Sequence, residues 1–206
     1  MFFRATGVGS VLDFGSLQTI TNGDGSSDRI RIDALNGGVI NLSNVTQIID
    51  PNVGNTFGRS VAVNSDGVGS QINLSSLVNF NDVSASGGQS SLTTQNGGTL
   101  DIPSLTTLDG VSLNIGQANS FSVDQITSFT DGVIRVTGGD HTFTNLANGT
   151  GTRFELTGGT INLPALTQIN GASFDVSGGR TLTLPANVTA YIHDIGTIQD
   201  LSLIHI

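Results

Sequence analysis

Apolar residues alternate with small polar residues in short runs along most of the chain, and a glycine-containing turn precedes most of these runs. Alternation with a period of two predicts β-strands with one buried face, because successive side chains of a strand point to opposite sides. Frequent Asn-Gly, Asp-Gly and Gly-Gly pairs predict tight turns between the strands. We therefore expect an all-β chain.

The runs belong to a repeat, which is aligned by a turn followed by alternating apolar positions. The units are GSVLDFGSLQTI from residue 9, GGVINLSNVTQI from 37, GSQINLSSLVNF from 69, GGTLDIPSLTTL from 97, ANSFSVDQITSF from 118, GGDHTFTNLANG from 138, GGTINLPALTQI from 158 and GRTLTLPANV from 179. The first units begin 28 or 32 residues apart and the later ones 20 or 21 apart. The first three rungs therefore carry insertions, which all fall after the second strand.

A third short strand closes each unit, in the segments RIRID, SVAVN, SLTTQ, SLNIG, VIRVT, RFELT and SFDVS. Three strands per unit predict a single-stranded parallel β-helix, a β-solenoid of about eight rungs, in which neighbouring rungs share one core. We expect a right-handed coil, because parallel crossover connections are overwhelmingly right-handed. The solenoid is assigned to residues 5–195, with longer rungs over 9–96 and minimal rungs over 97–195.

Stacked rungs should place like residues in columns inside the core. The first strands give two columns, Leu12, Ile40, Ile72, Leu100, Phe121 and Ile161 in one and Phe14, Leu42, Leu74, Ile102, Val123, Phe143, Leu163 and Leu184 in the other. The third strands give the pairs Ile30/Ile32, Val61/Val63, Leu113/Ile115, Ile134/Val136, Phe154/Leu156 and Phe174/Val176.

The pattern resembles the degenerate GG-x-L-x-L-P-x-L-T-x-I repeats of very large bacterial β-strand repeat proteins, which are adhesin-like and autotransporter-passenger-like. The resemblance covers about residues 5–195 and is clearest in GGTLDIPSLTTL and GGTINLPALTQI. It implies a secreted or cell-surface location and a structural or adhesive role. It carries over no functional residue, because that group shares no active-site motif.

Charge and composition narrow the range of partners. The formal net charge is −9, and the seven arginines are scattered along the chain with no lysine, so we expect no basic patch for nucleic acid or an anionic membrane. The chain has no cysteine, which excludes disulfides and thiolate metal sites. No segment approaches the roughly 20 apolar residues of a membrane span, and the first residues lack the apolar run of a signal peptide.

Both ends of the chain suggest a fragment of a longer protein. Repeat-like sequence begins by residue 5, which leaves no room for the cap that protects a solenoid end. The last segment, residues 201–206, resembles the translation of a transposase adapter used in sequencing libraries. The alternative is an ordinary apolar β tail. We expect adjoining solenoid rungs of the parent chain as partners.

One pair of carboxylates invites a catalytic interpretation. The outward column of the third strands is predicted to contain Arg31, Ala62, Thr93, Asn114, Arg135, Glu155 and Asp175. Glu155 and Asp175 would then lie one rung apart, near the separation that retaining glycosidases use. The competing interpretation is a surface cross-strand ion pair with Arg135, which is the commoner arrangement. We favour ion pairing and assign no catalytic or cofactor-binding residue.

Other polar features have structural interpretations that we prefer. The outward column of the first strands should form hydrogen bonds from rung to rung or present a flat glycan-binding or ice-binding face; it comprises Asp13, Asn41, Asn73, Asp101, Ser122, Thr142, Asn162 and Thr183. Only Thr181/Thr183 fits the Thr-x-Thr arrays that ice binding needs. Segments 22–29, 50–55 and 64–67 supply oxygen atoms suited to Ca²⁺, but tight turns need the same residues.

Isolated histidines and asparagines carry no site by themselves. His141 falls in an apolar column, His193 stands alone, and the Asn-x-Thr triplets at Asn44, Asn148 and Asn187 are expected by chance in so Asn-rich and Thr-rich a chain. We expect a non-enzymatic structural or adhesive segment of a bacterial surface or secreted protein, which contacts surface glycans or proteins through its inserted loops. The alternatives are part of a carbohydrate-active β-helix enzyme and, more remotely, an ice-binding solenoid.

Overall fold

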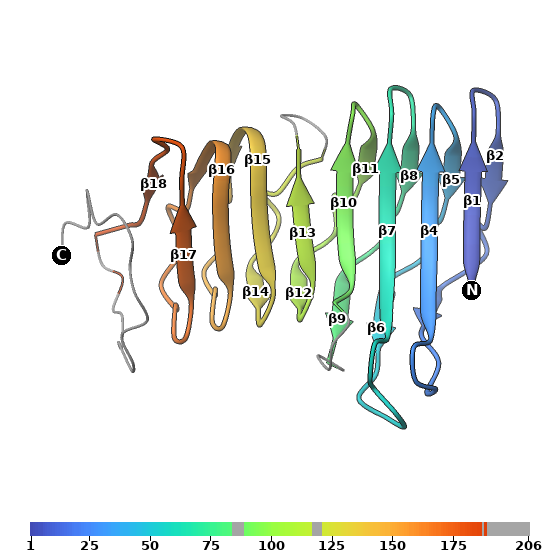
Figure 1. The fold of residues 1–206 in the computed structure, drawn as a ribbon, viewed down its shortest axis with the longest axis horizontal. Coiled ribbons are helices and arrows are strands. Elements are labelled where there is room, and N and C mark those ends of the chain that lie inside the picture. The colour runs from blue at the N-terminus through green and yellow to red at the C-terminus, as the bar shows by residue number, and fades with distance from the viewer. Residues whose placement is uncertain (84–88, 117–120, 187, 189–206) are drawn as a thin grey trace.

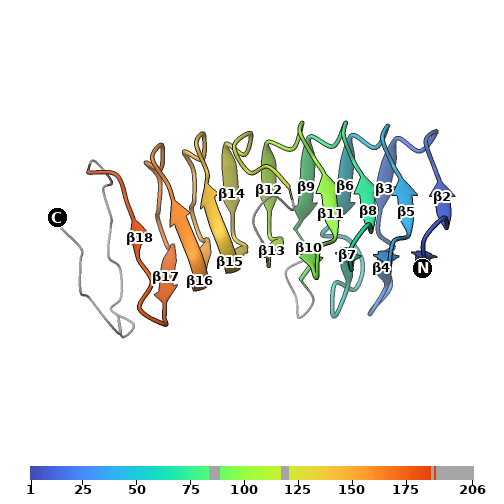
Figure 2. The same cartoon turned by 90° about the horizontal axis from the view of Figure 1, so that it is seen from above.

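The chain is an all-β parallel solenoid, as the sequence predicts. The computed structural model describes residues 1–83, 89–116, 121–186 and 188. Strands stack side by side in three sheets that face different sides of an elongated molecule (Figures 1 and 2). Within the described ranges no helix is long and apolar enough to cross a membrane.

Sheet A contains the predicted third strands and runs the length of the molecule. Its strands, in spatial order, are β1 (Phe2–Thr6), β4 (Arg29–Leu35), β7 (Ser60–Asp66), β10 (Ser91–Gln95), β13 (Ser112–Ile115), β15 (Val133–Thr142), β16 (Arg153–Asn162) and β17 (Ser173–Val176). Eight strands at about 4.8 Å spacing span roughly 34 Å. Strand β1 extends the sheet beyond the first aligned repeat unit.

Sheets B and C are made by the first and second strands of the rungs. Sheet B contains β2 (Val11–Asp13), β5 (Val39–Asn41), β8 (Gln71–Asn73) and β11 (Thr99–Asp101). Sheet C contains β3 (Thr19–Thr21), β6 (Gln47–Asp50), β9 (Asn79–Asp82), β12 (Thr107–Asp109) and β14 (Ser128–Thr130). The ends of β15 and β16, with β18 (Leu182–Thr183), continue the side of sheet B.

The register confirms the first of the first-strand columns from Leu12 to Leu100 and corrects the third-strand pairs. Leu12, Ile40 and Ile72 are successive partners, as predicted. In sheet A, however, Leu92 pairs with Val63 and continues to Leu113. The observed column is Phe3, Ile32, Val63, Leu92, Leu113, Ile134, Phe154 and Phe174. The pairs Ile30/Ile32 and Val61/Val63 therefore lie two positions earlier than the later pairs.

The cause of this shift is the length of the early strands. Strands β4 and β7 continue for two residues beyond the predicted segments, and their inward positions there are Ala34 and Ser65. Both side chains are fully buried; Ala34 stacks on Ser65, and Ser65 stacks on Thr94 of the next rung. A search of the sequence for alternating large apolar residues does not detect core positions that small or polar residues occupy.

Rung five departs from the three-strand plan. Phe121 and Val123 are buried in their predicted columns, but residues 121–123 form no strand. The side chain of Gln125 instead donates hydrogen bonds to the carbonyl oxygens of Ile102 at 2.8 Å and Ser122 at 2.9 Å. In the next two rungs the second strand is reduced to isolated bridges at Asn148 and Gln168.

A four-residue turn joins the first and second strands of each rung. The amide of Val45 donates to the carbonyl of Leu42, and the amides of Leu105 and Leu166 repeat this pattern three residues after an inward apolar residue. Pro103 and Pro164 come directly after that apolar residue. They therefore occupy the second position of the turn, where the fixed φ of proline is favourable. The L-x-x-L spacing of the repeat thus encodes a β-turn between two buried side chains.

The insertions of the first three rungs all leave the solenoid at the corner between sheets C and A, as predicted. They connect β3 to β4, β6 to β7 and β9 to β10, and the first two protrude at the lower edge of Figure 1. In rung four the same corner is crossed by only two residues, between β12 and β13. This corner is where the rungs differ most.

The corner between sheets A and B alternates between two kinds of turn. Residues 5–40 align with residues 65–100 without a gap, at an offset of 60 positions. Gly-Val-Gly-Ser turns begin at Gly7 and Gly67, and Asn-Gly-Gly turns begin at Asn36 and Asn96. Any side chain at Gly37 would meet that of Val8, at 2.8 Å from the Val8 Cγ2 atom. In this part of the chain the structural unit is therefore a pair of rungs.

Candidate functional sites on sheet A and at the loop corner

The outward polar column of sheet A is a continuous ladder, and its members differ in part from the predicted ones. Arg31 and Ala62 belong to the neighbouring column, because Ala62 pairs with Ser91. This is the same two-position shift that affects the core. The observed column is Arg4, Asp33, Asn64, Thr93, Asn114, Arg135, Glu155 and Asp175.

Glu155 and Asp175 are adjacent in register, as predicted, and Glu155 is held by arginines on both sides. One carboxylate oxygen of Glu155 pairs with Arg135, and the other lies 3.0 Å from Nε of Arg153. Arg153 also reaches Asp175, at 3.1 Å. Arg135 donates to Asn114 at 2.8 Å, and Asn114 donates to Thr93 at 3.0 Å. The carboxylates thus belong to an ion-pair chain that runs along the rungs, which is the interpretation we favoured.

The arginines are gathered on one face, contrary to the expectation that they are scattered. Five of the seven lie on the outward side of sheet A: Arg4, Arg29, Arg31, Arg135 and Arg153. Four carboxylates accompany them, those of Asp33, Asp66, Glu155 and Asp175. This face is therefore nearly neutral in a chain of formal net charge −9. Sequence spacing concealed the cluster, because strands of successive rungs are far apart along the chain.

At the β1–β4 end of this face two guanidinium groups converge on one buried carboxylate. Oδ2 of Asp33 lies 3.0 Å from Nη2 of Arg4 and 3.5 Å from Nη2 of Arg31. The Asp33 side chain is 1% exposed, whereas those of Arg4 and Arg31 are 43% and 55% exposed. The ring of Phe2 lies 4.2 Å from the Arg4 guanidinium carbon and 5.8 Å from that of Arg31.

At the loop corner, polar residues replace apolar ones in the core of the first three rungs. Asp50 pairs with Asp82 in register, and Asn22 donates a hydrogen bond of 3.0 Å to Asp50. All three residues are buried. In rung four, Asp109 pairs with Asn81, so the residue after it, Gly110, lies beside Asp82. Buried polar residues are therefore found where a loop leaves the solenoid, and glycine where the loop is missing.

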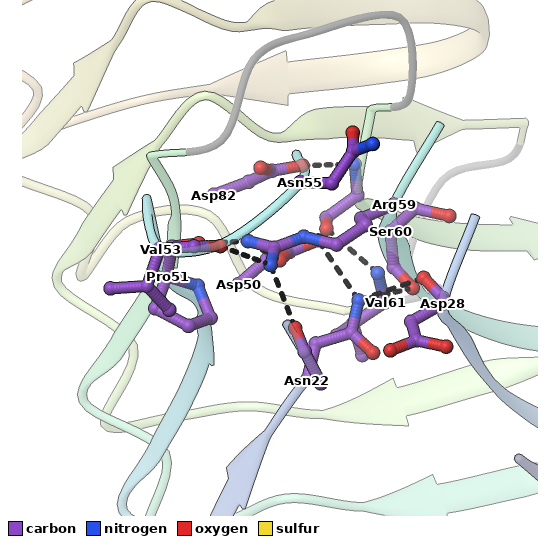
Figure 3. Close-up of polar contacts among 12 residues, drawn as sticks. Asn22, Asp28, Asp50, Pro51, Val53, Asn55, Arg59, Ser60, Val61 and Asp82 are labelled. Carbon is purple, nitrogen blue, oxygen red and sulfur yellow. Dashed lines mark hydrogen bonds and ion pairs between the residues drawn. The ribbon is translucent and has the colours of Figure 1, made fainter. Parts of the chain in front are cut away.

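Arg59 fills the space between two of these loops (Figure 3). Its side chain is fully buried, and its guanidinium lies 2.9 Å from the fully buried carboxylate of Asp50. It donates 2.8 Å hydrogen bonds to the carbonyl oxygens of Gly23 and Val53, and a further hydrogen bond to that of Pro51. A single cation thus collects oxygen atoms from both inserted loops.

The two loops also bond to one another directly. The amide of Asn55 donates to the carbonyl of Asp24 at 2.9 Å, and the amide of Ser27 donates to the carbonyl of Phe57 at 2.8 Å. Within the first loop, Asn22 donates to the carbonyl of Asp28 at 3.0 Å. On the outside, Phe57 is 66% exposed. The loop pair is therefore a folded unit that displays an aromatic ring.

Asp50 is the titratable group that this environment perturbs. Burial raises the pKa of Asp50 above its ordinary value of 3.8, and the nearby charge of Asp82 acts in the same direction. The hydrogen bond from Asn22 and the pairing with Arg59 lower that pKa, but they do not offset the burial.

The segments considered for Ca²⁺ use their oxygen atoms within the protein. In segment 50–55 Arg59 takes the oxygen atoms of Asp50, Pro51 and Val53. In segment 22–29 the Asp28 carboxylate accepts the amide of Gly25 at 2.9 Å. In segment 64–67 the Asp66 carboxylate accepts hydrogen bonds from the amides of Gln95 and Asn96. Across the residues that the structure describes, no group of three or more acidic, histidine or cysteine side chains could hold a metal ion.

The outward column of the first strands is in register from Asp13 to Asp101 and from Thr142 to Thr183, as predicted, whereas Ser122 between them lies in no strand. Side chains of this column mostly form hydrogen bonds within their own turns. Asn41 donates to Asp13 of the rung before at 2.7 Å, which is a rung-to-rung bond. The side-chain oxygens of Asn41 and Asn73 accept the backbone amides of Ser43 and Ser75, two residues further on. These bonds shape the turns between the first and second strands.

His141 lies in the apolar column, as expected, next to Ile161 in register. It is buried, and its Nε2 lies 3.1 Å from the carbonyl oxygen of Gly138. An open groove beside it is lined by Phe121, Ser122, Val123, Asp124, Asp140, His141 and Thr142.

The side chains of Asn44 and Asn148 donate hydrogen bonds to the carbonyl of Gly15 and the hydroxyl of Ser128. His193, Asn187 and the segment 201–206 lie outside the described residues.

Comparison of the chain with protein-family models, with curated proteins and with solved structures gives no match.

Proposed function

We propose that the chain is a non-enzymatic structural and adhesive segment of a larger surface or secreted protein. The observation that carries this proposal is the buried Asp50–Arg59 pair, which fixes two inserted loops on a stiff row of rungs. Removing two charges from water costs several kcal/mol per ion before their attraction is counted. In the minimal rungs, as far as the structure describes them, the core closes without such a pair. Its contribution is therefore to hold the loops in one geometry, as a surface that makes specific contacts requires.

The ladder on sheet A supports the same conclusion. Glu155 lies between Arg135 and Arg153, and each of its two carboxylate oxygens pairs with one of these arginines, so its contacts link neighbouring rungs. The secreted or cell-surface location rests on the resemblance to β-strand repeat proteins.

A turnover assay separates this function from the enzymatic alternative. The full chain is incubated with a panel of neutral and acidic polysaccharides, and new reducing ends and unsaturated products are measured. We expect no product above the level of a heat-denatured control. Product formation by the native chain that the substitution Glu155→Gln abolishes would overturn the proposal and establish a polysaccharide-degrading enzyme.

A further inference from the structure

We infer that the outward face of β1 and β4 is a binding site for a carboxylate-bearing sugar of an acidic polysaccharide. The inference rests on the proposed adhesive function and names its ligand class. Three arginines lie on this part of sheet A, Arg4, Arg29 and Arg31, and the only carboxylate among the outward positions of these two strands is Asp33. The local excess of positive charge stands out in a chain whose formal net charge is −9.

The arrangement of the arginines suits an oxyanion. Arg4 and Arg31 come from adjacent strands, and both point an Nη2 atom at the same oxygen of Asp33. Each guanidinium has five N–H donors in a planar fork, so most donors of this pair remain for another acceptor. Because Asp33 is buried beneath them, it fixes the two groups in place and neutralises only one of the two charges. Arginine forks of this kind bind carboxylates bidentately.

The aromatic ring selects the rest of the ligand. Phe2 is 48% exposed and lies against both guanidinium groups, so an apolar surface adjoins the anion site. A uronic acid has this combination, because its pyranose ring has an apolar face and bears a carboxylate. A free inorganic anion would use the arginines and leave the ring unoccupied.

The neighbouring rungs offer hydrogen-bonding groups to the rest of a polysaccharide chain. Beyond β4, sheet A presents small uncharged residues on its outward side over three rungs, Ala62, Asn64, Ser91, Thr93 and Asn114, and Asp66 at the end of β7 is the one carboxylate on these strands. Together these strands form a flat track about 15 Å long at the spacing of parallel strands. Hydroxyl and amide groups along this track match the hydroxyls of successive sugars.

The test measures binding of an oligogalacturonate by calorimetry, with a neutral malto-oligosaccharide of equal length and inorganic sulfate as comparison probes. We expect the oligogalacturonate to bind, its affinity to fall with added salt, and the other two probes to bind at least about tenfold more weakly. Arg31→Gln should weaken binding about tenfold, because it removes a charge-assisted bidentate contact. Arg180→Gln removes the same charge away from sheet A and should change the affinity less than about twofold.

A second variant changes the affinity in the opposite direction. Asp33→Asn removes the buried counter-charge and should tighten binding several-fold, about as much as one additional favourable charge contributes. Its amide could donate to Oδ1 of Asn64, the neighbour in register, for which the described residues provide no hydrogen-bond partner. Circular dichroism and thermal unfolding verify that each variant is folded.

Three results would overturn the inference: no binding of the oligogalacturonate, equal binding of the neutral oligosaccharide or sulfate, or equal weakening by Arg31→Gln and Arg180→Gln. Absence of binding leaves the proposed structural role intact, because that role concerns the loop corner. Cleavage of the oligogalacturonate, in contrast, would overturn the proposed function itself.

Discussion

Among single residues, Arg59 is fully buried and is paired with a fully buried carboxylate. We expect Arg59→Met to lower the free energy of unfolding by about 3–5 kcal/mol, because the substitution leaves the Asp50 carboxylate buried without its counter-charge. It also removes the donors that bind the carbonyl oxygens of Gly23 and Val53. Urea denaturation followed by circular dichroism measures the loss.

The matched control removes both charges. The double substitution Asp50→Asn with Arg59→Met should recover part of the loss, because no uncompensated charge remains in the core. Arg180→Met, at an exposed position, should change the stability by less than about 0.5 kcal/mol. If Arg59→Met were as mild as Arg180→Met, the buried pair would not hold the loop corner together.

The raised pKa of Asp50 has a definite effect on the pH dependence of stability. In the window between the ordinary value of 3.8 and the raised value, the folded chain binds more protons at Asp50 than the unfolded chain does. The contribution of Asp50 to stability is therefore largest below this window and falls as pH rises through it. Many paired surface carboxylates show the opposite trend.

Comparing wild type with Asp50→Asn isolates this contribution. Unfolding free energies measured from pH 3 to pH 7 should decline more steeply with rising pH in the wild type than in the variant, or rise less steeply. Parallel curves for the two proteins would show that Asp50 has the same affinity for protons in the folded and unfolded states.

Residue pattern alone could not reveal Arg59 or the arginine face. Arg59 lies in a Gly-rich and Asn-rich loop, where arginine is ordinarily solvated, and its burial depends on a second loop that is about 30 positions away. The arginines of sheet A form two groups on one face, on β1 and β4 and on β15 and β16, only when the strands are stacked in register. Glu155, Asp175 and Arg135 were predicted correctly because they occupy equivalent positions of consecutive minimal rungs, which contain no insertions.

At the scale of strands and turns, close stacking of rungs restricts the corner glycines. A β-carbon on Gly98 would overlap the carbonyl oxygen of Ser65 in the rung before it. We expect Gly98→Ala to destabilise the protein by about 1–3 kcal/mol, since the backbone of one of the two rungs must move. Thermal unfolding measures the change.

Gly116 provides the comparison, because a β-carbon there would lie 3.1 Å from the carbonyl oxygen of Thr94 and needs a smaller adjustment. Gly116→Ala should therefore be the milder substitution. If the two variants lost equal stability, steric contact between rungs would not explain why glycine occupies the corner.

The sequence predicted the strands well because period-two alternation and Gly-rich turns determine them locally. The segments RIRID and SVAVN fall within β4 and β7. The register between long and short rungs was harder to predict, since Ala34 and Ser65 are core residues without large side chains. The missing strand at 121–123 likewise depends on Gln125, whose side chain takes the carbonyl oxygen of Ile102.

For the molecule as a whole, stability should vary along the row of rungs. Each rung contacts only its neighbours, and the apolar side chains of β17, Phe174 and Val176, are only partly buried. We expect the amides of β7 and β10 to exchange with deuterium more slowly than those of β17. Hydrogen exchange with mass spectrometry resolves these strands. Uniform exchange rates would indicate that the solenoid opens as one cooperative unit.

The alternation of Gly-Val-Gly-Ser and Asn-Gly-Gly turns constrains how such a chain can change in length. Gain or loss of two rungs together preserves the contact of each valine with a glycine of the next rung, as between Val68 and Gly97. Gain or loss of one rung would bring two turns of the same kind together, so that valine would lie beside valine or glycine beside glycine. Duplications and deletions in this part of the gene should therefore be tolerated in steps of 60 codons, the offset between the aligned segments, and selected against in steps of a single rung.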